Sequence, residues 1–319
     1  MSIEQTTLSD LLAFDKTYLS RIAHRRSITT SHPYETLASL PGTTPMVHEL
    51  YTWLFTVYLP QRLSTIFTIN PKALSPSLLP QPYNLLLSES IPFPPPQDPI
   101  DCLRLISSHI DTDFLLLAPR PVKDQEEKYH LLSFANCFPS GFRPRDKLGL
   151  PLAQIHAPVP GYAAKLERSM DRFFARIGKG EIVKRANWTV TTSGDDIFCL
   201  KGNHFTGDDG VGTHDPGREG KGEEGKLETE IERQKADVKV EDCRLRMERQ
   251  TLHRLPETGA LVFAFKTYIY PLDEVKGEPG MAEAMAEAVL GLGRGNVPEM
   301  EVYKRQVVWG GKVREYLLS

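Results

Sequence analysis

Residues 243–272 read CRLRMERQTLHRLPETGALVFAFKTYIYPL, and this stretch decides the fold. Two runs of strand-forming residues flank the sequence Pro-Glu-Thr-Gly at 256–259, whose proline and glycine are typical of a tight turn. β-Branched and aromatic residues fill the second run, as in a strand that packs on a core. The stretch therefore predicts a long antiparallel hairpin.

The chain before the hairpin predicts helices first and strands later. Helical spacing predicts a first helix, behind a Ser9 cap, over the apolar residues Leu11, Leu12, Phe14, Tyr18, Leu19 and Ile22. Residues 46–67 predict a second helix, interrupted at Pro60. A short helix is expected from Asp98 or Asp101 onward. The later predictions are strands over DFLLLAP (113–119), KYHLLSFANCFP (128–139) and NWTVTT (187–192), and a long helix over 162–178.

This order of elements predicts an α+β fold in which helices flank an antiparallel sheet, because the regular βαβ alternation of a parallel sheet is missing. We divide the chain into a helical and Pro-rich N-terminal region (1–112), the first part of an α+β core (113–205), a charged insertion (206–240), and the core hairpin with C-terminal helices (241–319). The insertion is rich in glycine and charge, so we expect it to be disordered or loosely helical.

Composition narrows the class of protein. The net charge is -3, which argues against a nucleic-acid-binding surface over the whole molecule. No apolar run is long enough to span a membrane, and the start of the sequence lacks the pattern of a secretory signal. The four cysteines are far apart, so we expect reduced thiols in a cytoplasmic protein rather than a disulfide framework or a zinc site.

Common enzyme motifs give little support to nucleotide or hydrolase chemistry. The sequence GLGRGN at 291–296 has the wrong spacing for a dinucleotide fingerprint, and no GxxxxGK[ST] motif is present. The GxSxG and HExxH motifs are missing as well.

The stretch FPSGFRPRDKLGLPLAQIHAPVPGY (138–162) carries one histidine, His156, ahead of a Pro-x-Pro-Gly turn. Prolines restrict the backbone and so immobilise the loop that holds the imidazole. Arg143, Arg145 and Lys147 offer partners for anions, and apolar residues lie between them. A rigid loop of this kind suits an anionic and largely apolar ligand such as haem. The alternative is a structural, hydrogen-bonded histidine among solvated basic residues.

The first strand of the hairpin is unusually polar. Side chains alternate along a strand, so Arg246, Glu248 and Gln250 share one face and Arg249 and His253 share the other. Such dense polar residues on both faces favour a polar network or a lined pocket. Cross-strand ion pairs on an exposed sheet are an equally good interpretation.

Three motifs, two of them long, occur in order along the chain: FPSGFRPRDKLGLPLAQIHAPVPGY (138–162), RANW (185–188) and ERQTLHRLPETGALVFAFKTYIYPL (248–272). Together with the DKTYLSR region and LPQR (59–62), they resemble the haem-dependent oxidative N-demethylase alpha-subunit-like family, including fungal members labelled HRQ family proteins. The resemblance implies a PAS-like fold that holds haem b. It also implies oxidation of a secondary methylamine by O2, with electrons from a separate reductase that carries flavin and iron–sulfur groups.

On this basis we expect a haem-binding mono-oxygenase subunit that acts on a small amine. His156 is the expected axial ligand, and Arg143, Arg145, Lys147 and Tyr162 are the expected contacts of the cofactor. Glu248, Arg249 and Gln250 are expected on the substrate side, where a carboxylate holds a substrate ammonium. The alternatives are a non-catalytic haem or small-ligand sensor and a ligand-free interaction protein.

Overall fold

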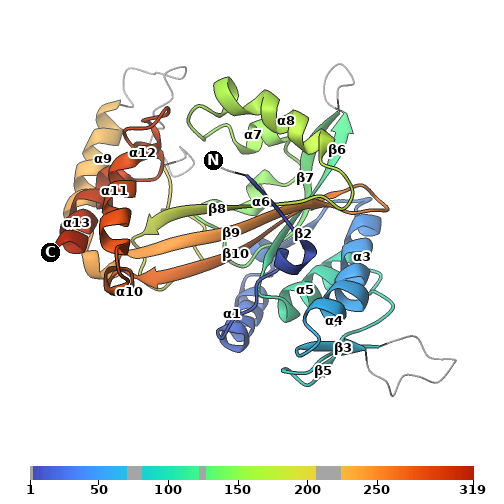
Figure 1. Ribbon diagram of the computed structural model, residues 1–319. Coiled ribbons are helices and arrows are strands. Elements are labelled where there is room, and N and C mark those ends of the chain that lie inside the picture. Colours follow the sequence, from blue (N-terminus) through green and yellow to red (C-terminus); the bar gives the residue numbers. More distant parts are fainter. Residues whose placement is uncertain (1–2, 70–80, 122–126, 206–223) are drawn as a thin grey trace.

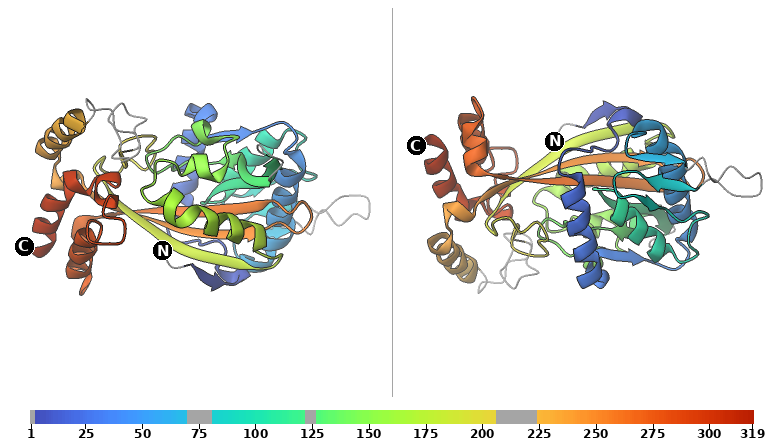
Figure 2. Two further views of the ribbon diagram at one scale, coloured as in Figure 1. Left: turned by 90° about the horizontal axis from the view of Figure 1, so that it is seen from above. Right: turned by 90° about the horizontal axis from the view of Figure 1, so that it is seen from below.

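The computed structural model describes residues 3–69, 81–121, 127–205 and 224–319. Within these ranges one large antiparallel sheet crosses the molecule (Figure 1). N-terminal helices cover one of its faces, short helices from the middle of the chain cover the other, and C-terminal helices gather at one end of the long strands (Figure 1, Figure 2). The predicted combination of helices with an antiparallel sheet is confirmed. None of the described helices has the length and apolar composition needed to span a membrane.

The large sheet has the strand order β1-β8-β9-β10-β6-β7-β2, and all neighbouring strands are antiparallel. Its strands are β1 (Glu4–Thr6), β8 (Ile182–Thr191), β9 (Arg244–Arg254), β10 (Leu261–Pro271), β6 (Asp113–Pro121), β7 (Glu127–Ala135) and β2 (Leu37–Ser39). A small sheet contains β3 (Phe67–Ile69), β4 (Pro82–Asn84) and β5 (Glu89–Ser90). The three strands predicted before the hairpin are confirmed as β6, β7 and β8.

The predicted hairpin is confirmed as β9 and β10. The two strands pair without interruption from Arg254 opposite Leu261 to Arg244 opposite Pro271. At the turn, the Glu49 carboxylate accepts hydrogen bonds from the backbone N–H of Glu257 at 2.6 Å and of Thr258 at 2.8 Å. A shift of one residue would exchange the two faces of the strand, so this contact with a helix helps to fix the register.

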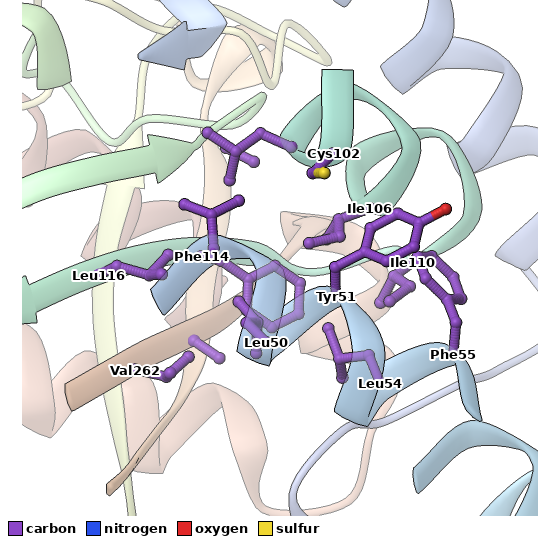
Figure 3. Close-up of a cluster of buried hydrophobic side chains, with 14 of the residues drawn as sticks. Leu50, Tyr51, Leu54, Phe55, Cys102, Ile106, Ile110, Phe114, Leu116 and Val262 are labelled. Atoms are coloured by element: carbon purple, nitrogen blue, oxygen red, sulfur yellow. The ribbon is translucent and has the colours of Figure 1, made fainter. Parts of the chain in front are cut away.

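The first face of the sheet carries the main apolar core (Figure 3). The elements on this side are α1 (Tyr18–Ser31), α2 (Pro33–Thr36), α3 (Thr44–Trp53), the π-helix η2 (Leu54–Tyr58), α4 (Leu59–Arg62) and α5 (Pro99–His109). Leu50 and Tyr51 of α3 pack with Phe114 of β6 and Val262 of β10. The expected cap of α5 is present, because the Asp98 carboxylate accepts from the backbone N–H of Ile100 at 2.8 Å.

The predicted helix behind Ser9 is wrong in its first half. Only a short 3-10 turn forms over Leu8–Asp10, and the helix α1 begins at Tyr18. Leu11 and Leu12 are buried, but in non-helical backbone whose polar groups bond to side chains. Tyr58 accepts from the Leu12 N–H at 3.1 Å, for example. Tertiary hydrogen bonds and burial therefore replace the helix that apolar spacing predicted.

The second predicted helix ends at Arg62 and not at residue 67, where β3 begins. Pro60 does not interrupt it, because α3, η2 and α4 follow each other directly. Proline lacks the N–H that a regular turn uses, and a wider π-helical turn just before it accommodates this loss.

The opposite face of the sheet is covered by residues 138–178. They form α6 (Pro144–Lys147), α7 (Leu152–Ile155), the π-helix η5 (Tyr162–Leu166) and α8 (Glu167–Arg176). Met170, Phe173 and Phe174 of this layer pack against a cluster that includes Leu252 of β9 and Val183 of β8. The long helix predicted over 162–178 is thus present, with a π-helical first turn.

The C-terminal helices form a second apolar cluster around the buried Trp309. They are α9 (Glu224–Asp237), the 3-10 turn η6 (Val240–Asp242), α10 (Leu272–Gly277), α11 (Met281–Gly291), α12 (Met300–Tyr303) and α13 (Gln306–Leu318). Residues 206–223 of the expected insertion lie outside the described residues. The rest includes α9, which lies along α13 (Figure 1) and buries Leu227 in the same cluster.

A buried ion pair joins α1 to the sheet and to the loop that follows β7. Arg25 donates to the Asp113 carboxylate at 2.7 Å, and both side chains are almost completely excluded from solvent. Asp113 also accepts from the backbone N–H of Cys137 at 2.8 Å and of Phe138 at 2.9 Å. One carboxylate therefore fixes the place where the loop of residues 138–162 leaves the sheet.

We expect Asp113→Ala to destabilise the protein by about 3–5 kcal/mol, because it leaves the Arg25 charge buried without its ion-pair partner. Asp101→Ala is the matched control, since Asp101 pairs with Arg104 at the surface, where such a pair contributes at most about 1 kcal/mol. Urea unfolding of both variants measures the difference. Equal losses of stability would contradict the assigned role of Asp113.

Candidate functional site

A hydrogen-bonded polar network lies on the face of the sheet that residues 138–178 cover. Glu248 and Gln250 of β9 point to this face, as predicted, with only 7% and 5% of their surfaces exposed. The Gln250 amide donates to the Glu248 carboxylate at 2.8 Å. Arg185 of β8, opposite Gln250 in the register, donates to the Gln250 side-chain oxygen. The network interpretation of this strand is therefore confirmed, and exposed ion pairs are excluded for these two residues.

Two more residues extend the network toward the C-terminal helices. Asn187 of β8 donates from its amide nitrogen to Glu248 at 3.4 Å, and its amide oxygen accepts from the Lys304 ammonium at 3.2 Å. Lys304 also donates to the backbone carbonyl of Trp188 at 2.5 Å. Burial lowers the pKa of Lys304 to about 8, although the Glu248 charge acts to raise it. Asn187 thus connects a buried carboxylate with a buried amine.

Three buried polar atoms beside the network lack a hydrogen-bond partner among the described residues. They are Oγ1 of Thr189, Oγ1 of Thr267 and Nε of Arg246. Thr189 lies opposite Arg246, and Thr267 lies opposite Glu248, so all three belong to the same face of the sheet. A buried polar group without a partner costs about 1–3 kcal/mol. Their concentration here indicates a surface that is complementary to a polar ligand.

His156 follows α7 on the layer above this face, and its ring is oriented by two contacts. Its Nδ1 lies 2.9 Å from the carbonyl oxygen of Leu152, which can only accept, so Nδ1 carries the proton and Nε2 keeps a lone pair. The ring stacks on Tyr162 at 4.8 Å between centroids. Burial lowers the pKa of His156, and the charges of Arg185 and Lys147 lower it further. A neutral imidazole with a fixed tautomer is the form that binds a metal.

The other basic residues of the loop have structural partners. Arg143 forms a two-point contact with the Glu35 carboxylate of α2. Arg145 donates to the backbone carbonyls of Tyr34 and Leu37, and its guanidinium lies 4.0 Å from the centre of the Tyr34 ring. These contacts attach the loop to the N-terminal part of the chain.

Arg249 is not brought together with Glu248 and Gln250. It lies on the opposite face of β9, where it donates to the carboxylate of Asp10 at 2.6 Å and to the carbonyl of Leu11 at 3.3 Å. These bonds hold the N-terminal segment against the sheet.

Sequence reasoning missed Arg185, Asn187 and Lys304 as site residues. The alternation within RANW places Arg185 and Asn187 on one face, but only the register of β8 against β9 shows that this face is the one of Glu248. Lys304 directly follows the short helix α12 in the C-terminal cluster, far from β8 in the sequence. No local pattern in the sequence indicates that contact.

The sequence matches a known family over most of its length. Residues 2–314 match the family described as haem-dependent oxidative N-demethylase, alpha subunit-like. The chain belongs to this family. The match covers nearly the whole chain, including the polar network, the loop of His156 and the C-terminal helices.

The family name implies haem, and the described residues fit that group. They contain no cluster of three or more His, Cys, Asp or Glu side chains suited to a metal ion. Haem iron requires only one or two protein ligands, because the porphyrin supplies the other four. His156 offers such a donor at Nε2, next to a sheet face with buried cations and polar atoms that lack protein partners.

The other candidate histidines are less suited to bind iron at this face. His109 lies 3.4 Å from the Asn84 amide in the N-terminal layer, and His130 of β7 lies opposite Ala118, which packs against the core on the N-terminal face of the sheet. His253 points to the opposite face of β9, where its ring packs in a tilted arrangement 5.4 Å from the ring of Trp53. Both of its ring nitrogens are buried without a partner among the described residues, and burial lowers its pKa to about 4.

His253 should make the fold sensitive to acid. Below pH 6.5 the unfolded chain protonates this ring while the folded chain does not until about pH 4, so stability falls as the pH drops through this window. We expect His253→Phe to reduce the stability lost between pH 7 and pH 5 by about 2 kcal/mol. Urea unfolding at both pH values measures this, with His32→Phe at an exposed position as the control. An unchanged pH dependence in His253→Phe would contradict the assignment.

Proposed function

We propose that this chain is the haem-binding oxygenase subunit of a system that demethylates a small secondary amine. The observation that carries the proposal is the fixed tautomer of His156, whose Nδ1 is held by the Leu152 carbonyl in a member of a haem-dependent family. We propose Nε2 of His156 as the axial donor to haem b. The seven-stranded sheet and its covering helices would form the PAS-like scaffold that the sequence motifs imply.

Bound haem would supply the iron that activates O2, and the residues of the chain would position the amine. Glu248 is the carboxylate of the network, and its buried position strengthens attraction to a substrate ammonium. Gln250 and Asn187 both donate to Glu248 and so fix the direction of its carboxylate. The substrate nitrogen would therefore be held at a defined place on the sheet. Tyr162 restricts the His156 ring by stacking on it, and thus contacts the cofactor side.

The basic residues of the loop need a revised assignment. Arg143 and Arg145 form hydrogen bonds with α2 and the segment after it. We therefore propose that they position the loop, and we no longer propose them as the main contacts of the haem propionates. Lys147 remains proposed as a propionate partner, because its charge acts on His156.

We further propose that the electrons come from a separate reductase with flavin and iron–sulfur groups. The four cysteines are buried and form no disulfide, which fits neither a cluster of the chain's own nor an oxidising compartment. The cytoplasm is therefore the proposed location.

His156→Ala should abolish or shift the Soret band of the haem-loaded protein, because the iron loses its nitrogen donor. The fold should remain, since the Tyr162 ring and the apolar contacts of α8 still hold the layer. Absorption spectra and circular dichroism of the variant measure both effects. His130→Ala is the control, because that ring also bonds to a backbone carbonyl but lies on β7. A folded His156→Ala protein with an unchanged spectrum would rule out the ligand assignment.

Catalysis is tested separately from haem binding. O2 consumption with a chemical reductant and a secondary methylamine, together with formaldehyde release, is expected for the oxygenase. A haem-loaded protein that consumes no O2 with any such amine would instead be the non-catalytic sensor.

A further inference from the structure

Lys304 is a buried cation that has no carboxylate partner in the part of the chain that the structure describes. Only 7% of its surface is exposed, yet its ammonium donates to two neutral oxygens, one from Asn187 and one from the Trp188 backbone. Among the described residues no carboxylate lies within ion-pair distance of it, and Glu248 is reached only through Asn187. Lysine is rarely buried unless it is paired, because taking its charge out of water is costly. The position of Lys304 therefore requires an explanation beyond packing.

A second buried cation on the same side has the same property. Arg246 is 1% exposed and donates to the backbone carbonyls of Ile197, Phe138 and Pro139, but forms no ion pair within the described chain. Its Nε has no hydrogen-bond partner within the described ranges, nor does Oγ1 of Thr189 opposite it.

Lys304 and Arg246 act on a common place in the structure. The pKa of the buried His204 is lowered to about 3, mainly by burial and in part by the charges of Lys304 and Arg246. The His204 ring lies 4.7 Å from the ring of Tyr303, the residue before Lys304. The strand register supports this, because Arg246 lies opposite Thr189, the residue after Trp188, whose carbonyl accepts from Lys304.

We propose that Lys304 is the centre of a carboxylate-binding subsite on this face of the sheet, with Arg246 contributing positive charge. The subsite rests on the proposed function and takes a carboxylate from one of two sources, a propionate of the haem or the acid group of an N-methylated amino acid. A carboxylate suits the donors available, because one ammonium and neutral hydroxyl groups match a single negative charge. An ammonium group is excluded here by repulsion and is left to Glu248.

The experiment compares Lys304→Gln with Lys312→Gln. Glutamine keeps an N–H donor for the Trp188 carbonyl but removes the charge. Lys312 is the matched control, because it also donates to a backbone carbonyl, that of Val238 at 2.6 Å, on the exposed side of α13. Circular dichroism and thermal melting verify that both variants are folded.

The first arm titrates the haem-free protein with iron protoporphyrin IX and with its dimethyl ester, whose propionates carry no charge. If a propionate is the ligand, the wild type prefers haem over the ester, and Lys304→Gln weakens haem binding by about ten- to a hundredfold without affecting the ester. Lys312→Gln should bind both porphyrins like the wild type.

The second arm measures binding of radiolabelled N-methylglycine and dimethylamine by equilibrium dialysis. If the substrate supplies the carboxylate, Lys304→Gln binds haem normally but loses about ten- to a hundredfold in affinity for N-methylglycine, and dimethylamine binding is unchanged.

The outcomes separate this inference from the proposed function. If the wild type binds haem and its ester equally, and binds N-methylglycine no better than dimethylamine, the carboxylate-binding subsite is ruled out without need of a variant. Haem binding by the protein is unaffected by that result. Equal losses for charged and uncharged ligands in Lys304→Gln overturn it as well, because they indicate a structural role. A wild type that binds no haem but binds N-methylglycine through Lys304 overturns the proposed function and supports the subsite.

Discussion

The buried pair of Arg25 and Asp113 is the constraint on which the rest of the structure depends. Arg25 donates to Asp113 and to the carbonyls of Ser107 and Thr112, so α1, α5 and β6 meet at one guanidinium. The second oxygen of Asp113 holds the start of the loop at Phe138. A buried pair of this kind contributes little net stability compared with apolar residues, because both charges lose their hydration. Its value lies in position: the loop that carries His156 leaves the sheet at one place and in one direction.

The two faces of β9 carry different groups of side chains, and the register of the hairpin determines which side chains lie on which face. Arg249 and His253 face the N-terminal layer, where they hold the first segment and complete the core. Glu248 and Gln250 face the layer of His156. A one-residue shift would bury Arg249 among the site residues and turn Glu248 toward the apolar core. The contact of Glu49 with the hairpin turn therefore helps to keep Glu248 and Gln250 in place on the other side of the sheet.

Features encoded locally could be predicted from the sequence, and features that depend on tertiary contacts could not. The hairpin, the cap of α5 and the shared face of Glu248 and Gln250 follow from turn residues and period-two alternation. Leu11 and Leu12 have helical spacing but lie outside any helix, because bonds to Tyr58 and Thr251 satisfy their backbone. The site was predicted only in part for the same reason. Its carboxylate lies in a recognisable strand, whereas Lys304 reaches it from a helix after more than one intervening element.

The buried charge of Lys304 on the polar face couples ligand binding to the stability of the folded protein. Burial lowers the pKa of Lys304 to about 8, so the folded chain holds this proton less firmly than the unfolded chain does. Keeping the ammonium charged at neutral pH thus reduces the stability of the ligand-free protein, and stability rises with pH between about 8 and 10.5 on account of this group. An anion that binds beside Lys304 raises the lysine pKa again and removes that cost, and it stabilises only the folded state. The same buried charge that weakens the empty site therefore strengthens its preference for a negatively charged ligand.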